Sequence, residues 1–340
     1  MKQKNTKREY KIVLLLALLL PLLFFLSINV GYTDIKLTEL FQVMTGGGSP
    51  RNNIVVFQFR LPRIVIAMLV GAGFSLSGCI LQGITKNPLA DPGLMGINAG
   101  AGIVVLTFMV LSGTLTTGWI LSLPVFSLAG ALLTGSVIYL LSNRKDYGIS
   151  PMRLVLNGVA IQAGINAVMT LLVLKLDDTQ AEFLAAWQAG SIWNSTWNSV
   201  IALLPWILMG FICLIFMAGK LDILAMGDEI SIGLGIAVVK EKRKLLFLAV
   251  ALAAASVAIS GNINFVGLIA PHLSRRLVGA RHKILLPTSA LVGAILVTGA
   301  DIISRTIIKP AEIPNGIVVS IIGAPYFIVL LIINRRAAVS

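Results

Sequence analysis

The segment Lys220–Lys244, KLDILAMGDEISIGLGIAVVKEKRK, interrupts a chain that otherwise consists mostly of apolar runs. Asp222 and Asp228 are each placed to cap a helix of one or two turns, and Gly227 and Gly233 are placed to end these helices. Such helices are too short to span a bilayer, so we expect them to lie at its surface and to offer a contact to another molecule. A solvated helical loop is the alternative interpretation.

The composition around this segment is that of a membrane protein. Of the 340 residues, 57% are hydrophobic and only 12% are charged, and the mean hydropathy is +0.92, whereas soluble domains carry about 25% charged residues. We therefore predict an all-α, polytopic membrane protein in which residues 1–340 form one transmembrane domain, with a cytoplasmic loop at about 220–244. The net charge of +13 is explained by orientation in the membrane rather than by nucleic acid.

The apolar runs predict ten crossings. The first run is too long for the apolar region of a signal peptide, and basic residues such as those at 240–244 gather in one set of loops, which predicts cytoplasmic termini. The eighth crossing is short and contains Pro271, but it is needed to place the basic segment 275–283 inside the cell. The expected crossings are 12–31, 61–84, 94–112, 120–142, 153–175, 198–218, 245–260, 263–277, 284–303 and 313–333.

Small and polar stripes mark particular helices. The second crossing carries Gly71, Ser75, Cys79 and Gly83 at a spacing of four, which indicates close helix packing. The fifth crossing carries Gln162, Asn166 and Thr170 at the same spacing. Polar side chains in a membrane helix face protein or a water-filled path, so this stripe predicts either a path lining or a hydrogen-bond seam between helices.

The turn Asn87-Pro-Leu-Ala-Asp-Pro92-Gly93 follows the second crossing. Two prolines and a glycine make it tight and rigid, and Asp91 is placed to cap the next helix. The turn is either a simple connection or a constriction at the cytoplasmic end of a path.

Arginines stand where the orientation rule predicts few of them. Arg60, Arg63 and Arg305 fall at the outer ends of the second and ninth crossings. They could bind lipid phosphates, or Arg305 could pair with Asp301 four residues away. The alternative is a set of arginine forks for the carboxylates of a docking protein.

Two other functional classes are weaker. An ion-coupled carrier needs a carboxylate inside the membrane, and Asp301 is the candidate. An intramembrane hydrolase would need Ser75 as nucleophile and His272 as base, but their expected depths differ. The chain has no G-x-x-x-x-G-K-[ST] loop, so it cannot hydrolyse ATP itself, and we expect it to bind no cofactor.

Five segments in order resemble the FecCD family of permeases, which import iron–siderophore, haem or cobalamin at the expense of ATP. The likeness extends from about residue 60 to 330. The matching segments are Arg60-Leu-Pro-Arg63, Gly71–Gly102, Gly233-Leu-Gly235, Phe265–His272 with Arg275, and Glu312–Phe327.

This resemblance implies a permease of the bacterial cell membrane that pairs with a second permease, identical or similar. It also implies two ATPase subunits, which use the ATP, and an extracytoplasmic binding protein. Iron(III)–siderophore is the commonest cargo of the resembling group, and haem or cobalamin is the alternative.

The resemblance also assigns roles to residues. The segment Asp222–Gly235 would dock into the ATPase, through Asp222, Met226, Gly227, Asp228, Glu229, Gly233, Leu234 and Gly235. Asn87, Pro88 and Leu89 would form one inner gate. Ser150, Pro151 and Met152 would form a second, although Pro151 departs from the Ser/Thr-rich pattern of the cobalamin relative. Arg60, Arg63 and Arg305 would meet glutamates of the binding protein.

Overall fold

A computed structural model of the chain describes residues 6–31, 37–93, 95–112, 117–144, 148–149, 151–193, 195–308 and 311–339. These residues are helical apart from turns and a ribbon of two short antiparallel strands, in which Asn143 pairs with Ile149. The elements in order are α1 (Thr6–Asn29), α2 (Leu37–Met44), α3 (Pro50–Ile54), the π-helical turn η1 (Val55–Arg60), α4 (Leu61–Thr85), α5 (Ile97–Ser112), α6 (Thr117–Ser142), β1 (Asn143–Arg144), β2 (Gly148–Ile149), α7 (Pro151–Val173), α8 (Asp178–Gln188), α9 (Trp197–Met226), α10 (Asp228–Gly233), α11 (Val238–Ser260), α12 (Val266–Val278), α13 (His282–Thr306) and α14 (Asn315–Val339).

The all-α prediction is confirmed, and α1, α4, α5, α6, α7, α9, α11, α12, α13 and α14 match the ten expected crossings in order. Within the described residues, eight helical segments are long and apolar enough to cross a membrane. The exceptions are α5, a shorter apolar helix, and α12, which has 13 residues. At 1.5 Å per residue α12 is about 20 Å long, whereas the apolar core of a bilayer is about 30 Å thick. The eighth crossing is therefore completed by non-helical chain.

That non-helical chain is the segment 261–265, which ends at Phe265 with a left-handed φ of +69°. After α12 the chain is back at the end of the molecule where α9 finishes, because the backbone N–H of His282 donates to the Asp222 carboxylate over 2.8 Å. The basic segment 275–283 therefore lies at the same end as the 220–244 stretch, as its charge predicted.

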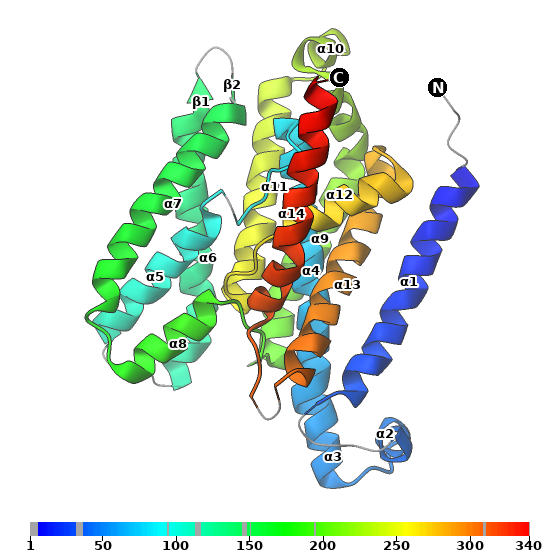
Figure 1. Ribbon diagram of the computed structural model, residues 1–340, viewed down its shortest axis with the longest axis vertical. Coiled ribbons are helices and arrows are strands. Elements are labelled where there is room, and N and C mark those ends of the chain that lie inside the picture. The colour runs from blue at the N-terminus through cyan, green and yellow to red at the C-terminus, as the bar shows by residue number, and fades with distance from the viewer. Residues whose placement is uncertain are drawn as a thin grey trace.

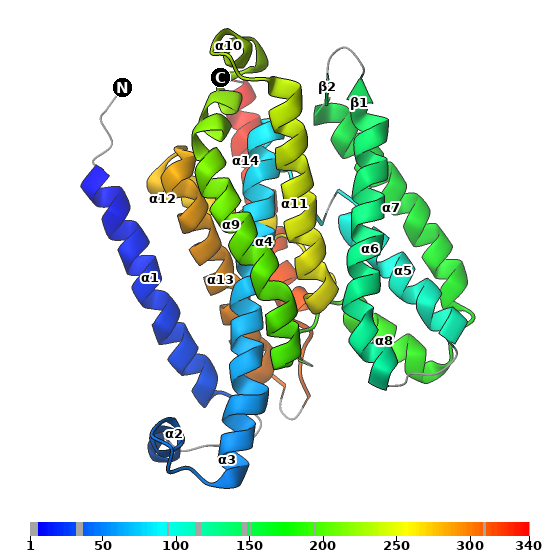
Figure 2. The same cartoon turned by 180° about the vertical axis from the view of Figure 1, so that it is seen from behind.

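The helices form a central cluster with one group beside it (Figures 1 and 2). Helix α4 is the most buried candidate span and lies among α9, α11, α12 and α13. Helices α5 to α8 form a group on one side, and α1 runs along α13 on the other. Helix α10, the start of α1 and the end of α14 lie at one end, called the α10 end below, and α2 and α3 lie at the opposite, α3 end.

Small residues allow α4 to approach its neighbours closely. A Cβ added at Gly71 would lie 2.2 Å from the Gly293 carbonyl oxygen, and one added at Gly78 would lie 1.9 Å from the Gly267 carbonyl oxygen. The packing interpretation of the stripe that begins at Gly71 is confirmed. Ser75 is fully buried and its hydroxyl donates to the Ser289 carbonyl over 2.6 Å, which argues against Ser75 as a nucleophile.

The second crossing starts earlier than predicted. Residues Pro50 to Thr85 form one helical run, in which η1 is a π-helical turn just before Pro62. The Leu61 N–H closes this wider turn by donating to the Val56 carbonyl. Pro62 removes one backbone donor, and π-turns of this kind are frequent at functional positions. Arg60 and Arg63 flank Pro62.

Candidate functional site

The 220–244 stretch forms one short helix between the ends of two long ones. Helix α9 continues to Met226 because Leu221 and Leu224 are fully buried and extend its packed face. Gly227, with φ +131°, then ends α9, as predicted. The basic residues 240–244 occupy the first turns of α11. The prediction of two short helices is therefore wrong, because the first of them is the end of α9.

Asp222 caps a different helix from the one predicted. Its carboxylate accepts the backbone N–H of His282 over 2.8 Å and lies 2.7 Å from the His282 Nδ1. His282 is the first residue of α13, and the N-cap residue Arg281 makes no side-chain cap. A carboxylate satisfies the free N–H groups at a helix start. Asp222 therefore fastens α13 to α9.

Helix α10 carries an exposed apolar surface, called the α10 surface. The side chains of Met226, Ile230, Ile232 and Leu234 are all more than half exposed, and such clusters mark interaction sites. A Cβ at Gly233 or Gly235 would meet nothing within 4 Å, so this face is open to a partner. Its exposed members are Met226, Glu229, Ile230, Ile232, Gly233, Leu234 and Gly235.

Ion pairs hold α10 and α11 in place. Asp228 is the first residue of α10, and its two carboxylate oxygens lie 2.9 and 2.7 Å from the Lys242 Nζ. Partial burial raises the pKa of the Asp228 carboxyl, but contacts with Lys242 and then Lys86 outweigh this effect and hold that pKa below its ordinary value. The prediction that Asp228 caps α10 is wrong, since Gly227 is the N-cap.

The turn after α4 is internally braced. The Leu89 N–H donates to the Asn87 side chain over 2.9 Å, and the Gly93 N–H donates to the Asp91 carboxylate over 2.8 Å. Asp91 therefore closes the turn instead of capping α5, which begins at Ile97. Pro92 lies against the start of α12, because a Cβ at Gly267 would be 2.7 Å from its Cδ. These contacts are those expected of a braced turn, and its rigidity and gating role stay predictions.

The second predicted gate is described only in part. Ser150 lies outside the described residues. Pro151 is the first residue of α7, and Met152 is 69% exposed. An exposed methionine at this end of α7 suits a gate or a subunit contact, and the gating role of these residues stays a prediction.

The polar stripe of α7 lines a hollow. Gln162, Asn166 and Thr170 face a cavity of about 360 Å³ between α5, α7 and the segment before α12. Asn98 donates to the Asn262 side chain over 2.5 Å, and the buried Asn98 Oδ1 has no hydrogen-bond partner. Among the residues that the structure describes, the lining holds no charged one: it comprises Asn98, Ala99, Gly102, Gln162, Asn166, Met169, Thr170, Val173, Trp187, Gln188 and Asn262.

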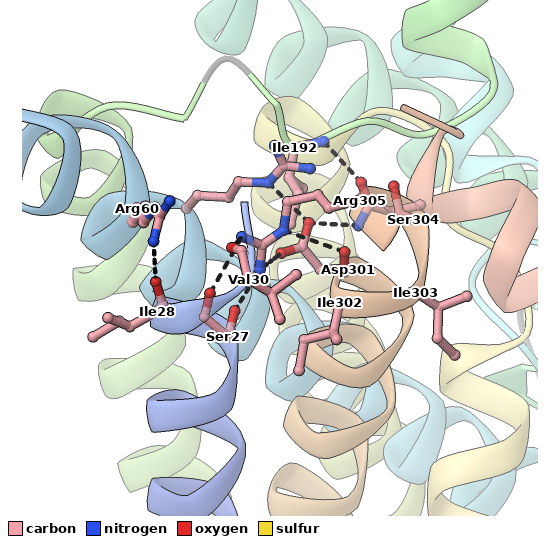
Figure 3. A network of polar contacts seen from close by, with 12 residues as sticks. Ser27, Ile28, Val30, Arg60, Ile192, Asp301, Ile302, Ile303, Ser304 and Arg305 are labelled. Carbon is pink, nitrogen blue, oxygen red and sulfur yellow. Dashed lines mark hydrogen bonds and ion pairs between the residues drawn. The ribbon is translucent and has the colours of Figure 1, made fainter. Parts of the chain in front are cut away.

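The arginines at the α3 end belong to a buried network (Figure 3). Arg63 Nε and Arg305 lie 2.8 Å from opposite oxygens of Asp301, and the Asn315 amide donates to Asp301 over 3.0 Å. Arg63 also pairs with Glu312 over 2.8 Å. The alternative in which Arg305 pairs with Asp301 is thus confirmed. Asp301 is fully buried and its charge is balanced by two arginines, which argues against it as the binding site of a coupling ion.

Arg60 and Arg305 also cap the end of α1. Arg60 donates to the Ile28 carbonyl, and Arg305 donates to the carbonyls of Ser27 and Val30. Cationic donors near a helix C-terminus satisfy its free carbonyls. Arg60, Arg63 and Arg305 are each less than 10% exposed, so they hold α1, α4 and α13 together. Their contact with a docking protein stays a prediction.

The sequence did not single out several residues of these sites. Asn98, Gln188 and Asn262 join the α7 stripe from three other segments, and Lys86 reaches the 220–244 stretch through Asp228. A single carboxamide in an apolar chain is weak evidence for a binding site, and the segment Gly261-Asn-Ile-Asn, with two carboxamides, is the signal that could have pointed to Asn262.

The chain matches the model of the FecCD transport family over residues 18–333. It is 44% identical to the iron(3+)-hydroxamate import system permease protein FhuG of Bacillus subtilis, over 96% of this chain and 98% of that one. It is 38% identical to the Fe(3+)-citrate import system permease protein YfmE of the same organism, over 98% of both. A solved inward-facing structure of a metal-chelate type ABC transporter is 32% identical and superposes with a TM-score of 0.83, covering 94% of this chain and 98% of that one.

Proposed function

This chain belongs to the FecCD transport family, and on that premise we propose that it is the membrane permease of an ATP-driven importer whose cargo is an iron(III)–siderophore of the hydroxamate class. The observation that carries the proposal is the 44% identity over nearly the whole of a hydroxamate permease. The permease is a transport subunit and not an enzyme. A haem or cobalamin importer is the alternative.

The hollow beside α7 supports this cargo chemically. The polar side chains that the structure places in its lining are carboxamides and a hydroxyl, and none of these described lining residues is charged. Amides donate and accept hydrogen bonds without carrying charge, so they suit the carbonyl and N–O oxygens of a neutral hydroxamate chelate. A highly anionic chelate would lose its hydration there without gaining a countercharge.

A second permease would supply the other wall of this path. Asn166 and Thr170 are exposed on α7, and so are the apolar side chains Leu156, Val159 and Leu171. A polar stripe turned toward lipid would be unfavourable, because polar side chains in membrane helices face protein or water. We infer that a second copy or a similar chain covers this face, with the stripe along the axis between the two subunits.

The ATPase subunits would bind at the α10 surface, which then lies on the cytoplasmic side. Its exposed side chains Ile230, Ile232 and Leu234 project from a short helix, as expected for a knob that fits a cleft of a partner. Each of two ATPase subunits would receive one such knob and hydrolyse the ATP. The extracytoplasmic binding protein would dock at the α3 end, where Glu312 and the arginine network lie.

The test is reconstitution in proteoliposomes with the ATPase and the binding protein of the same operon. ATP should drive uptake of iron presented as a trihydroxamate, and should drive much less uptake of a tricatecholate, haem or cobalamin. Uptake of haem or cobalamin without trihydroxamate would favour the alternative. Uptake that follows an ion gradient and needs no ATPase would overturn the importer proposal.

A further inference from the structure

Lys86 adopts a backbone conformation that its side chain does not favour. It follows the last residue of α4 with φ +54° and ψ +25°, and only Phe265 among the other described non-glycine residues has a positive φ. Glycine is the usual residue at such a helix end, because a Cβ is strained there. The contacts around Lys86 must therefore stabilise this conformation.

The Lys86 side chain crosses to α10. Its Nζ lies 3.4 Å from the Asp228 Oδ1, and Asp228 is at the same time bound by Lys242, whose side chain is only 6% exposed. Asp228 therefore connects three places: the start of α10, the second turn of α11, and the residue directly before Asn87. The ion pairs from Lys220 and Lys244 to Glu241 differ in this respect, because they join only α9 and α11.

We propose that the Lys86–Asp228 pair is a positioning link that passes the movement of α10 to the turn Asn87–Pro92. The inference rests on the proposed function, in which α10 contacts the ATPase and the turn closes the path. The turn is braced by the Asn87 and Asp91 side chains, so a displacement of Lys86 moves it as a unit.

The exposure of the pair suits a contact that breaks and re-forms in each cycle. The side chains of Lys86 and Asp228 are 43% and 45% exposed, and exposed ion pairs are weak enough to exchange readily. A second connection is made by packing, because Leu221 of α9 lies 3.5 Å from the position of a Cβ at Gly83. Loss of the ion pair should therefore weaken the coupling without abolishing it.

The test measures how accessible position 89 of the turn is to a thiol reagent, and this measurement does not need the cargo. Leu89→Cys, in a Cys213→Ser background, is labelled with a membrane-impermeant maleimide in membranes that hold the permease and its ATPase. Cys79 is fully buried and should not react. The rate of labelling at position 89 is measured with and without a non-hydrolysable ATP analogue. Co-purification of the ATPase is measured on the same samples.

The variants are chosen as a matched set. Lys86→Met removes the ammonium group, and Lys86→Arg keeps the charge and the reach. Lys220→Met is the control, because Lys220 has the same 43% side-chain exposure and also pairs with a carboxylate at the same end, but lies before the segment Asp222–Gly235 and has no link to the turn.

The nucleotide-dependent change in labelling should fall about two- to fivefold in Lys86→Met, the range that corresponds to loss of one exposed ion pair. Lys86→Arg and Lys220→Met should behave like the parent, and all three should retain the ATPase. An unchanged response in Lys86→Met, or an equal loss in Lys220→Met, would overturn the link. Failure of the parent permease to bind any ATPase would instead refute the proposed function, and the link with it.

Discussion

The replacement Asp301→Asn is the sharpest test of the network at the α3 end. Asp301 is fully buried, and its two oxygens lie 2.8 Å from Arg63 and from Arg305. Asparagine has nearly the same shape, but it replaces one of the two acceptor oxygens by an NH2 donor, so the change removes the charge and leaves one acceptor for the donors around position 301. Two buried guanidinium groups then share only the partly exposed Glu312.

The loss of stability caused by Asp301→Asn depends on how deeply the ion pairs are buried. Removing one member of a buried ion pair typically destabilises a protein by about 3–5 kcal/mol, because the remaining charge is left without compensation. Glu312 provides the internal comparison, since it pairs with the same Arg63 but its side chain is 38% exposed. Glu312→Gln should cost about 0–1 kcal/mol, as exposed pairs do.

Thermal unfolding of the purified permease in lipid nanodiscs, followed by tryptophan fluorescence, separates the two variants. Taking about 2–4 °C per kcal/mol, Asp301→Asn should lower the transition by at least about 6 °C, and Glu312→Gln by no more than about 4 °C. The scan rate must be the same throughout, because such transitions are partly kinetic. Equal, small shifts would refute the reasoning and would mean that the arginines are available to other partners.

Three further outcomes are expected. Gly233→Trp should abolish ATPase binding in pull-down assays, because it adds a bulky side chain to the α10 surface, but it should not affect membrane insertion, because open space surrounds this position. Gly219→Trp is the control: it also lies in open space but outside the α10 surface, and it should bind the ATPase normally. Leu89→Ala should leave ATP hydrolysis nearly unchanged and make sealed vesicles leaky to the cargo, and tight vesicles would contradict the gate. Asn166→Asp should reduce trihydroxamate uptake severalfold by placing a charge in the hollow, while Asn198→Asp, outside the hollow, should not.

The sequence predicted those features that depend on local pattern. Ten apolar runs appear as ten helices because their lengths and compositions leave few other options in a bilayer. The stripe Gln162, Asn166 and Thr170 was identified because a spacing of four places its members on one helix face. Asn262, on the other wall of the hollow, could not be found in this way, because only the tertiary fold brings it to α7.

The wrong predictions also concern contacts that only the tertiary fold creates. Asp222 and Asp228 stand in positions typical of N-caps, yet Asp222 binds His282, 60 residues later, and Asp228 binds Lys242 and Lys86, 14 and 142 residues away. Arg63 was assigned to the outer surface by its place in the sequence, and its burial depends on Asp301 and Glu312, which come more than 200 residues later. A cap and a through-space contact look alike in a sequence, because both need only a short polar side chain near a helix end.

The two ends of the permease differ in a way that bears on transport. At the α3 end the carboxylate of Asp301 is fully buried between two arginines, and separating such charges costs several kcal/mol. At the α10 end the Lys86–Asp228 pair is close to half exposed on both sides, and its separation costs about 1 kcal/mol or less. A conformational change separates most readily those contacts whose loss costs the least free energy. We therefore expect α1, α4 and α13 to move as one body hinged at the Asp301 network, and the opening that we propose is driven by ATP to be largest beside α10.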